Sequence, residues 1–194
     1  MVTSATLAEL ILGPPADDRQ PTAPTPREPL PTSLIADIAA GVAQVPEAWS
    51  DLVCHDPAER RPVRLMATDA YEVWIIGWTT GQSVRPHDHG GSSAAVLVTE
   101  GELTEVTLLG RRRPLAPGAV HQLGPRVVHD VVNTSDAPAT SIHVYSPPLS
   151  TMTYYDPVTW KPEETVRIEQ ESPVLSTWHG AQLLHPARKT ASAS

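Results

Sequence analysis

The strongest constraint on the fold is a series of short segments, rich in β-branched and aromatic residues, that begins near Val63. They read EVWIIGW, SAAVLVTE, LTEVTLL, AVHQL, VVHDVV and TSIHVYS, with glycine, proline, asparagine or aspartate between them. Short strands at regular spacing with turn residues between them are typical of a β-sandwich or barrel, and not of alternating strands and helices. We therefore predict an all-β domain.

The rest of the chain divides around this domain. Residues 1–32 include a stretch that is dense in proline and poor in apolar side chains, so we expect a flexible arm that cannot offset the entropy of ordering. Residues 33–165 are expected to form one domain, because 194 residues with 40% hydrophobic content supply one core and hardly two. The chain is expected to be irregular past Tyr155, with residues 166–194 as a tail that ends in disorder over 180–194.

A short helix is expected at the start of the domain. Over residues 33–45 the apolar side chains recur at helical spacing, behind Thr32 or Ser33 as a possible N-cap. These apolar residues are Leu34, Ile35, Ile38, Val42 and Val45. The domain is therefore expected to carry one amphipathic helix before its first strand.

Charge and cysteine content exclude several classes of protein. The formal net charge of −8 argues against a nucleic-acid surface, and the basic run Arg111–Arg113 is expected to be a solvated hairpin tip. The single cysteine, Cys54, excludes an intramolecular disulfide and fits a reducing cytosol. No apolar run approaches the roughly 20 residues that a membrane span requires. We expect a soluble cytoplasmic protein with neither nucleic acid nor membrane as a partner.

Two histidines carry the first chemical signal. His87 and His89 are separated by one residue, which on a strand places both side chains on one face, where two imidazoles can chelate one metal ion. Gly81 precedes them by five intervening residues, and the next strand-like segment ends at Glu100 and Gly101. This spacing resembles the first cupin motif, in which glycines make turns and histidines point into a barrel. The frame favours a metal site over two unrelated polar histidines.

A second segment, residues 125–133, resembles the second cupin motif and supplies His129 as a third ligand. At Ser93 or Ala94, where the general cupin pattern has glutamate, this sequence has no carboxylate. The expected site is three neutral histidines, with three positions left for an anionic chelating substrate and dioxygen. Imidazole suits zinc, copper, iron or nickel, so the residue types leave the metal open.

Two longer stretches resemble cysteine dioxygenase, in the thiol dioxygenase branch of the cupins. They are HDHGGSSAAVLVTEGELTEVTLL and VVHDVVNTSDAPATSIHVYSPPLSTMTYYD, of which SIHVYSPP is the most specific part. The resemblance spans about residues 60–156. It implies a cupin (jelly-roll) β-barrel with a short α-helical N-terminal segment, and Fe(II) bound by His87, His89 and His129. It also implies that cysteine chelates the iron and that dioxygen converts its sulfur to cysteine sulfinic acid.

The same resemblance assigns residues around the metal. Tyr145 matches a family tyrosine whose hydroxyl donates a hydrogen bond near the bound sulfur and oxygen, and His143 would hold that hydroxyl in place. The Ser146-Pro147 bond matches a position that the family holds cis. Ala94 stands where animal enzymes have a cysteine crosslinked to the tyrosine, so no thioether can form here.

The substrate carboxylate needs a cation, and the family places an arginine at the start of a strand upstream of the first motif. Arg64 occupies the comparable place, and its guanidinium fork fits a carboxylate geometrically. Pro62 stands where the family often has tyrosine, which weakens the match. Arg85, just before the metal motif, is the alternative. Arg64 is the preferred candidate for substrate binding, together with Tyr145.

Two other functions stay open. A dioxygenase of another small thiol, such as 3-mercaptopropionate, is the closer alternative, although Pro147 and Pro148 and the lack of arginine in residues 149–155 favour cysteine. A non-catalytic cupin that binds metal as a sensor is the other, and the His143–Tyr145 pair argues against it. The expected partners are a small thiol and dioxygen, and the family suggests a monomer.

Overall fold

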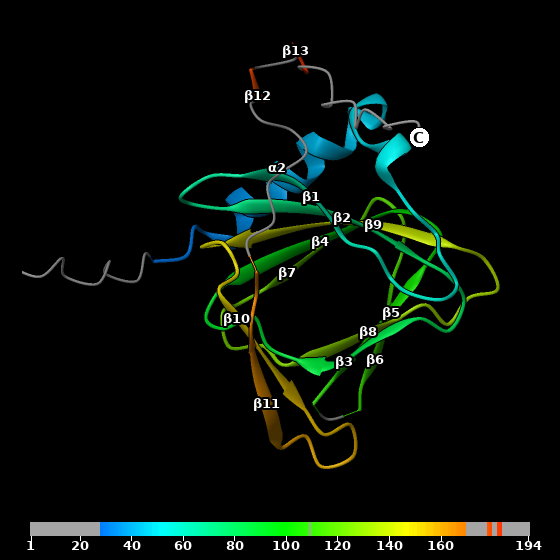
Figure 1. The fold of residues 1–194 in the computed structure, drawn as a ribbon, viewed down its shortest axis with the longest axis vertical. Helices are drawn as coiled ribbons and strands as arrows, with labels where there is room; N and C mark the ends of the chain where they lie inside the picture. The colour runs from blue at the N-terminus through cyan, green and yellow to red at the C-terminus, as the bar shows by residue number, and fades with distance from the viewer. Residues whose placement is uncertain (1–27, 109, 170–177, 180–181, 184–194) are drawn as a thin grey trace, which may run out of the picture.

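The computed structural model describes residues 28–108, 110–169, 178–179 and 182–183. Two antiparallel sheets face each other in a jelly-roll barrel (Figure 1). The first has five strands in the order β1 (Val63–Ala67), β2 (Glu72–Trp78), β9 (Ala139–Ser146), β4 (Ser93–Glu100) and β7 (Val120–Leu123). The second has six, in the order β11 (Pro162–Arg167), β10 (Thr151–Tyr155), β3 (Ser83–His87), β8 (His129–Val132), β5 (Leu103–Thr107) and β6 (Arg112–Leu115). The predicted all-β cupin barrel is confirmed.

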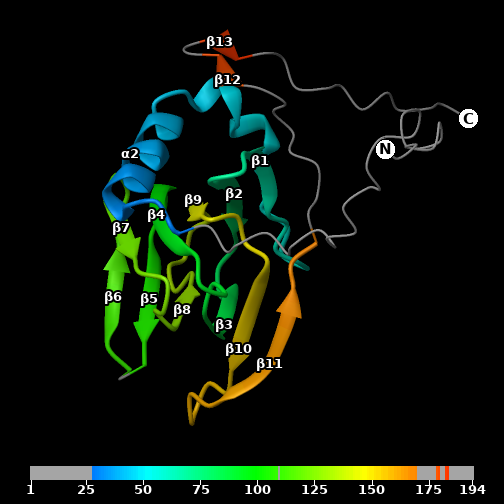
Figure 2. The same ribbon diagram turned by 90° about the vertical axis from the view of Figure 1, so that its left-hand side faces the viewer.

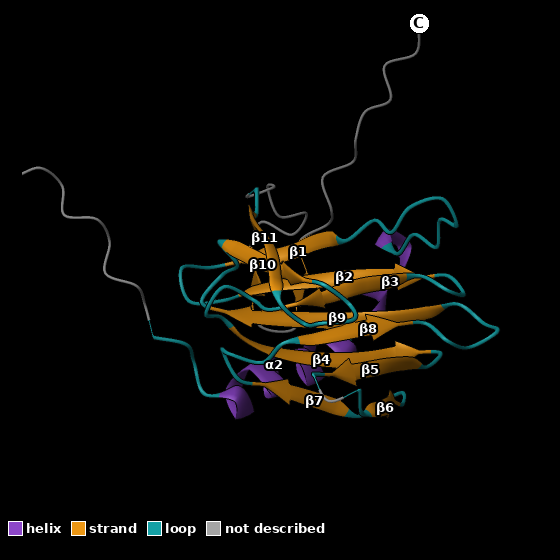
Figure 3. Ribbon diagram, turned by 90° about the horizontal axis from the view of Figure 1, so that it is seen from below, coloured by secondary structure: helices purple, strands orange, loops and turns teal. Residues whose placement is uncertain are grey.

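All six segments that the sequence singled out contain a strand. EVWIIGW and SAAVLVTE coincide with β2 and β4 residue for residue, and TSIHVYS lies within β9. These three strands are neighbours in the five-stranded sheet, where β9 pairs with β2 on one side and β4 on the other. In the view from below, most strands of the two sheets lie along roughly one line, with neighbours pointing in opposite directions (Figure 3).

Alternation along these strands separates two apolar cores. In β2, Val73 and Ile75 pack in the core beneath helix α2 (Thr32–Ala43), whereas Ile76 and Trp78 pack in the core between the sheets. Successive side chains on a strand point to opposite faces, so a strand buried on both faces is apolar along most of its length. This burial explains why the strands of this sheet stand out in the sequence.

Helix α2 covers the outer face of the five-stranded sheet, where it contacts β4, β7 and β9 (Figure 2). It buries Ile35, Ala36, Ala39 and Val42, so the predicted amphipathic helix is confirmed. Its N-cap is Pro31 and not Thr32 or Ser33, and no side chain caps it. The backbone carbonyl of Pro31 instead accepts the N–H groups of the first turn, from Leu34 at 3.0 Å and Ile35 at 3.2 Å. Two short 3₁₀ turns follow, Pro46–Ala48 and Ser50–Leu52.

Beyond Tyr155 the structure differs from the expected irregular chain. Strand β11 pairs with β10 in antiparallel register, from Thr151 opposite Arg167 to Tyr155 opposite Pro162. Its side chains are mostly exposed, as an edge strand allows, so it lacks the buried apolar alternation that reveals a strand in a sequence. Two further short strands are β12 (Trp178–His179) and β13 (Gln182–Leu183).

Other expectations fall partly outside this structure. Most of the proline-rich arm, residues 1–27, and residues 184–194 of the tail lie outside the described residues. The basic run Arg111–Arg113 is exposed, as predicted, and its last two residues open strand β6. Within the described residues no helix has the length and apolar character needed to cross a membrane.

Candidate metal centre

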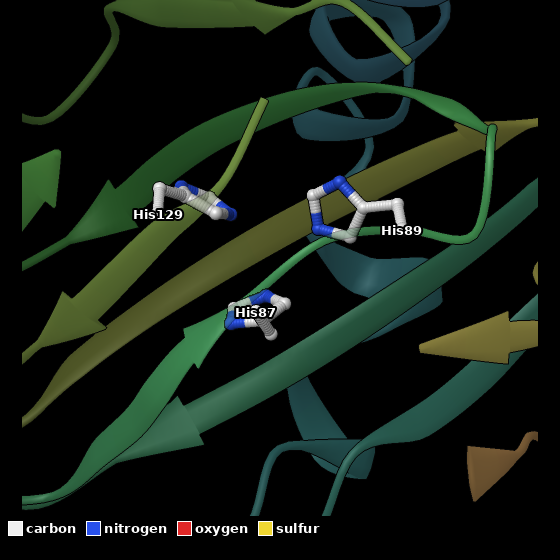
Figure 4. A group of neighbouring side chains, drawn as sticks. All are labelled: His87, His89 and His129. Atoms are coloured by element: carbon white, nitrogen blue, oxygen red, sulfur yellow. The ribbon is translucent and has the colours of Figure 1, made fainter. Parts of the chain in front are cut away.

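Three buried histidines converge inside the barrel. His87 ends strand β3, His129 begins β8 directly opposite it, and His89 lies in the loop after β3 (Figure 4). Their ring centroids are 4.8 to 5.2 Å apart, and one nitrogen from each lies within 4.8 Å of the others. No acidic residue joins this group within the described part of the chain. The three histidines that the sequence predicted as ligands are therefore brought together, without the cupin glutamate.

The route by which His89 reaches the centre differs from the prediction. His87 and His89 were expected on one strand, but β3 ends at His87. Asp88 follows the strand, and its backbone N–H donates to Thr153 O at 2.9 Å. The Asp88 carboxylate also accepts the Tyr155 hydroxyl at 2.8 Å, which anchors the loop to β10. His89 is therefore positioned by these contacts with β10 and not by strand alternation.

The framing glycines keep the role that the motif gives them. Gly81 and Gly101 adopt positive φ values of 81° and 68°, a region that side chains disfavour. A Cβ atom on Gly101 would also lie 2.4 Å from the carbonyl oxygen of Pro138. Each glycine thus marks a turn that no larger residue fits without strain.

Burial keeps His87 and His89 neutral. It is the main cause that lowers the pKa of His87 to about 3, and the neighbouring His129 lowers it further. Burial and the other imidazoles hold the pKa of His89 well below its usual range. Neutral imidazole has a free lone pair at neutral pH, which is the form that binds metal.

The remaining ring nitrogens show which atoms are free for a metal. The Nδ1–H of His129 donates to Glu105 Oε1 at 3.0 Å, and the Nδ1–H of His87 donates to the carbonyl oxygen of Arg85 at 3.0 Å. Nε2 of each ring is therefore the atom available to the centre. His129 Nε2 is buried without a hydrogen-bond partner, and so is Nδ1 of His89. A buried Nε2 without a partner beside two other imidazoles suits a bound cation, and imidazole is a ligand type that suits Fe(II).

A cavity of about 220 Å³ lies beside the histidines. Most of its lining is aliphatic or aromatic, and Arg60 is its only guanidinium among the described residues. The lining comprises Arg60, Pro62, Trp74, Ile76, Trp78, Val84, His87, His129, Val131, His143, Tyr145, Leu149, Met152, Tyr154 and Ile168. The space thus suits a small ligand with an anionic group and an apolar body.

Arg60 is the cavity cation that sequence reasoning missed. Its guanidinium carbon lies 4.7 Å from the centre of the Trp78 ring, and Nη1 makes a long contact of 3.4 Å with Ser83 O. Nε of Arg60 is buried without a hydrogen-bond partner. Burial lowers the pKa of Arg60 from its ordinary value, although an arginine keeps its charge at neutral pH. The available N–H groups make Arg60 a candidate for binding a carboxylate.

The two arginines that the sequence proposed are engaged elsewhere. Arg64 does not line the cavity, because its Nη2 forms a buried ion pair with Glu72 Oε2 at 2.8 Å. Arg85 lies on the outside, paired with Glu163 at 3.4 Å and Glu164 at 2.8 Å. The family places its arginine at the start of a strand, which favoured Arg64 in β1 over Arg60, which precedes that strand. The Arg60–Arg61 doublet was the available signal, but which of its members faces inward depends on packing.

A hydrogen-bonded chain on β9 and β2 reaches the same cavity. Trp78 Nε1–H donates to Ser141 Oγ at 2.8 Å, and Ser141 Oγ lies 2.8 Å from His143 Nε2. His143 Nδ1 lies 3.1 Å from the Tyr145 hydroxyl. Since Ser141 accepts from Trp78, its own proton is available to His143 Nε2, which leaves Nδ1–H to donate to the Tyr145 oxygen. The Tyr145 proton is then free for another acceptor.

The two titratable residues of this hydrogen-bonded chain, His143 and Tyr145, are neutral. Burial, followed by the charge of Glu72, raises the pKa of Tyr145 above its ordinary value, and burial lowers that of His143 to about 3. The Tyr145 ring lies 5.0 Å from the His89 ring. Ala94 is the cross-strand partner of Tyr145, so the position expected for a crosslinking cysteine faces it, and the Ser146–Pro147 bond is cis as the resemblance implies.

Comparison with known proteins gives a match to one family model and a set of similar solved structures. Residues 27–158 match the family model described as cysteine dioxygenase type I. No curated protein matches this chain.

Several solved structures are similar over about half of the chain. A Thermus thermophilus protein is 23% identical with a TM-score of 0.47, over 51% of this chain and 93% of its own. A Klebsiella pneumoniae protein with a double-stranded β-helix domain is 21% identical with a TM-score of 0.48, over 50% and 85%. An RmlC-like cupin from Desulfovibrio desulfuricans is 20% identical with a TM-score of 0.45, over 50% and 90%.

Proposed function

Because this chain belongs to the cysteine dioxygenase type I family, we propose that it is an Fe(II)-dependent dioxygenase that converts L-cysteine and dioxygen to cysteine sulfinic acid. The observation that carries the proposal is the meeting of two systems at one cavity. One is the three-histidine group, and the other is the hydrogen-bonded chain that ends at the Tyr145 hydroxyl.

His87, His89 and His129 would hold the iron. Bound Fe(II) would supply a coordination site for the thiolate and the redox chemistry with dioxygen. The protein's contribution is to keep the three rings turned toward one another in a buried site, with His87 and His89 held neutral. Because no carboxylate joins the ligand set, the site would keep the full positive charge of the metal for an anionic substrate.

Arg60 takes the role of carboxylate anchor that the sequence gave to Arg64. A guanidinium offers paired N–H donors that match a carboxylate, and such charge-assisted bonds are stronger than neutral ones. Arg60 lines the same cavity as His87 and Tyr145, so a thiol of the size of cysteine can meet all three. The aromatic and aliphatic remainder of the lining would surround the reacting sulfur with apolar groups.

Tyr145 would act as a hydrogen-bond donor to the sulfur or oxygen atoms of the reacting group. Its raised pKa keeps the proton on the phenol, and His143 occupies the phenol oxygen as a donor. The proton is thereby directed away from His143. Ser141, itself held by Trp78, bonds to Nε2 of His143 and fixes that ring. The Tyr145 hydroxyl is therefore oriented before substrate arrives.

The proposal is tested by loading the full chain with Fe(II) without oxygen and then measuring oxygen uptake with cysteine. With ¹⁸O₂, both labelled atoms are expected in the sulfinate by mass spectrometry. An iron-loaded chain that consumes no oxygen with cysteine or other small thiols would contradict the proposal.

The cavity also gives weight to 3-mercaptopropionate as a second candidate. No carboxylate side chain of the described residues lines it, so no side chain is present to pair with an ammonium group. If the amine of cysteine binds the metal, that lack is immaterial. Comparing kcat/KM for the two thiols decides, because a preference for 3-mercaptopropionate would show that the amine adds nothing.

A non-catalytic metal sensor is less favoured, because metal binding alone has no need of an oriented phenol. Metal analysis of the purified chain together with product analysis separates the two. Zinc in the site and no sulfinate would favour the sensor.

A further inference from the structure

The three candidate ligands differ in what holds the back of each ring. Nδ1 of His87 donates to a backbone carbonyl, and Nδ1 of His89 has no partner. Nδ1 of His129 donates to a carboxylate, Glu105 Oε1, at 3.0 Å. His129 is therefore the one of the three that a charged side chain orients.

Glu105 connects this ring to the surface. It lies on β5 with its side chain only 3% exposed, and its other oxygen, Oε2, accepts from Arg113 Nη2 at 2.6 Å. Arg113 is the cross-strand partner of Glu105 on β6, and its side chain is 50% exposed. Each carboxylate oxygen thus has one partner, inward to His129 and outward to Arg113. The sequence had assigned Arg113 only to a solvated hairpin tip.

The charge of Glu105 is compensated on both sides. Burial disfavours a charged carboxylate, and the contacts with His129 at 3.0 Å and Arg113 at 2.6 Å offset that cost. A buried carboxylate with a single partner would be costly, so the two contacts support each other. Arg113 has the exposure to be replaced without opening the core.

We propose that Glu105 and Arg113 are positioning residues of the metal centre, in which Glu105 fixes the ring and tautomer of His129 and Arg113 fixes Glu105. The physical basis is that a carboxylate behind a ligating imidazole orients the ring and makes its metal-facing nitrogen a stronger donor. The inference rests on the metal site of the proposed function, and it is independent of which thiol is oxidised.

The alternative is that Glu105 and Arg113 form only a structural tie between β5 and β6. That role predicts a loss of stability on substitution, with the metal affinity of the folded protein unchanged. Metal affinity measured on folded protein therefore separates the two roles.

The test measures the dissociation constant of Fe(II), and of Co(II) by its absorption spectrum, for the full chain and its variants. Glu105→Gln keeps the shape of the side chain and removes its charge, and it is expected to weaken binding roughly 10- to 100-fold. Arg113→Gln is expected to weaken binding in the same direction by a smaller factor. Glu102→Gln, just before β5, and Arg112→Gln, on β6, are matched controls at exposed positions, and both are expected to bind as the parent does.

Two outcomes overturn the inference. One is parental metal affinity in folded Glu105→Gln, with circular dichroism as the check on folding. If Glu105→Gln does not fold, the inference is overturned by parental metal affinity and an unchanged Co(II) spectrum in Arg113→Gln. A parent chain that binds no metal would instead contradict the metal site of the proposed function, so the two failures are distinguishable.

Discussion

Arg60 and Arg64 lie four positions apart, yet the same substitution is expected to lower catalytic efficiency at Arg60 and stability at Arg64. Arg60→Met removes the guanidinium that lines the cavity but keeps an apolar chain to pack against Trp78. Hydrogen bonds to charged groups contribute about 1.5–3 kcal/mol. The variant should therefore lose roughly 10- to 150-fold in kcat/KM for cysteine. Since the carboxylate is held before and during reaction, most of the loss should appear in KM.

Arg64→Met is expected to act on stability instead. It would leave Glu72 buried without its ion-pair partner, and breaking such a pair from one side costs about 3–5 kcal/mol. For a chain of this size that corresponds to a fall in Tm of roughly 6–20 °C. The exposed Arg61, which pairs with Asp56 and Glu59, is the matched control, and Arg61→Met should produce neither effect.

The assay is steady-state oxygen uptake with cysteine and with cysteamine, which has the thiol and amine but no carboxylate. With cysteamine, Arg60→Met and the parent chain should have similar kcat/KM values, because this substrate has no carboxylate for Arg60 to bind. Thermal unfolding of each variant accompanies the kinetics. Unchanged kcat/KM for cysteine in Arg60→Met, or a raised KM in an Arg64→Met chain as stable as the parent, would refute the assignment.

Three further outcomes follow from the hydrogen-bonded chain on β9. Tyr145→Phe removes only the hydroxyl and should lower kcat roughly 10- to 150-fold, with parental kcat as the contradicting result in the oxygen-uptake assay. Ser141→Ala removes the donor to His143 Nε2 and should lower kcat by a smaller factor, whereas an unchanged kcat would show that the tautomer does not depend on Ser141. The metal-free chain should lose unfolding free energy as pH falls from about 6.5 toward 3, because burial lowers the pKa of His143 to about 3 and only the unfolded chain takes up the proton in that range. Urea unfolding should show a shallower loss in His143→Gln, and an identical pH dependence would count against a buried neutral His143.

The sequence located the strands whose burial is most complete. β2, β4 and β9 contribute buried side chains both to the core on the α2 side of their sheet and to the core between the sheets, so their apolar runs are continuous. β11 has few buried side chains, and β3 carries exposed residues before His87. A strand that buries little leaves little pattern in the sequence, which is why the end of β3 and the whole of β11 could not be located from it.

The candidate ligands were predictable because the motif spacing reflects a local turn geometry around Gly81 and Gly101. Arg60 was not, because its place depends on contacts with Trp78 and with Ser83, which are distant in the chain. Glu105 was missed for the same reason, since its contact with His129 links two different strands. The roles of Arg60 and Glu105 arise from tertiary contacts, so only the structure could reveal them.

The two functional systems belong to different sheets. His87 and His129 are held by the six-stranded sheet, whereas Ser141, His143 and Tyr145 alternate along one strand of the five-stranded sheet. The distance from Tyr145 to the metal centre is therefore set by how the sheets pack. His89 lies in the loop that joins β3 of one sheet to β4 of the other, and its ring contacts Tyr145. Interiors pack densely and transmit strain. A substitution in the core between the sheets should therefore change the reaction rate by altering the distance from Tyr145 to the metal centre, even where it contacts neither system.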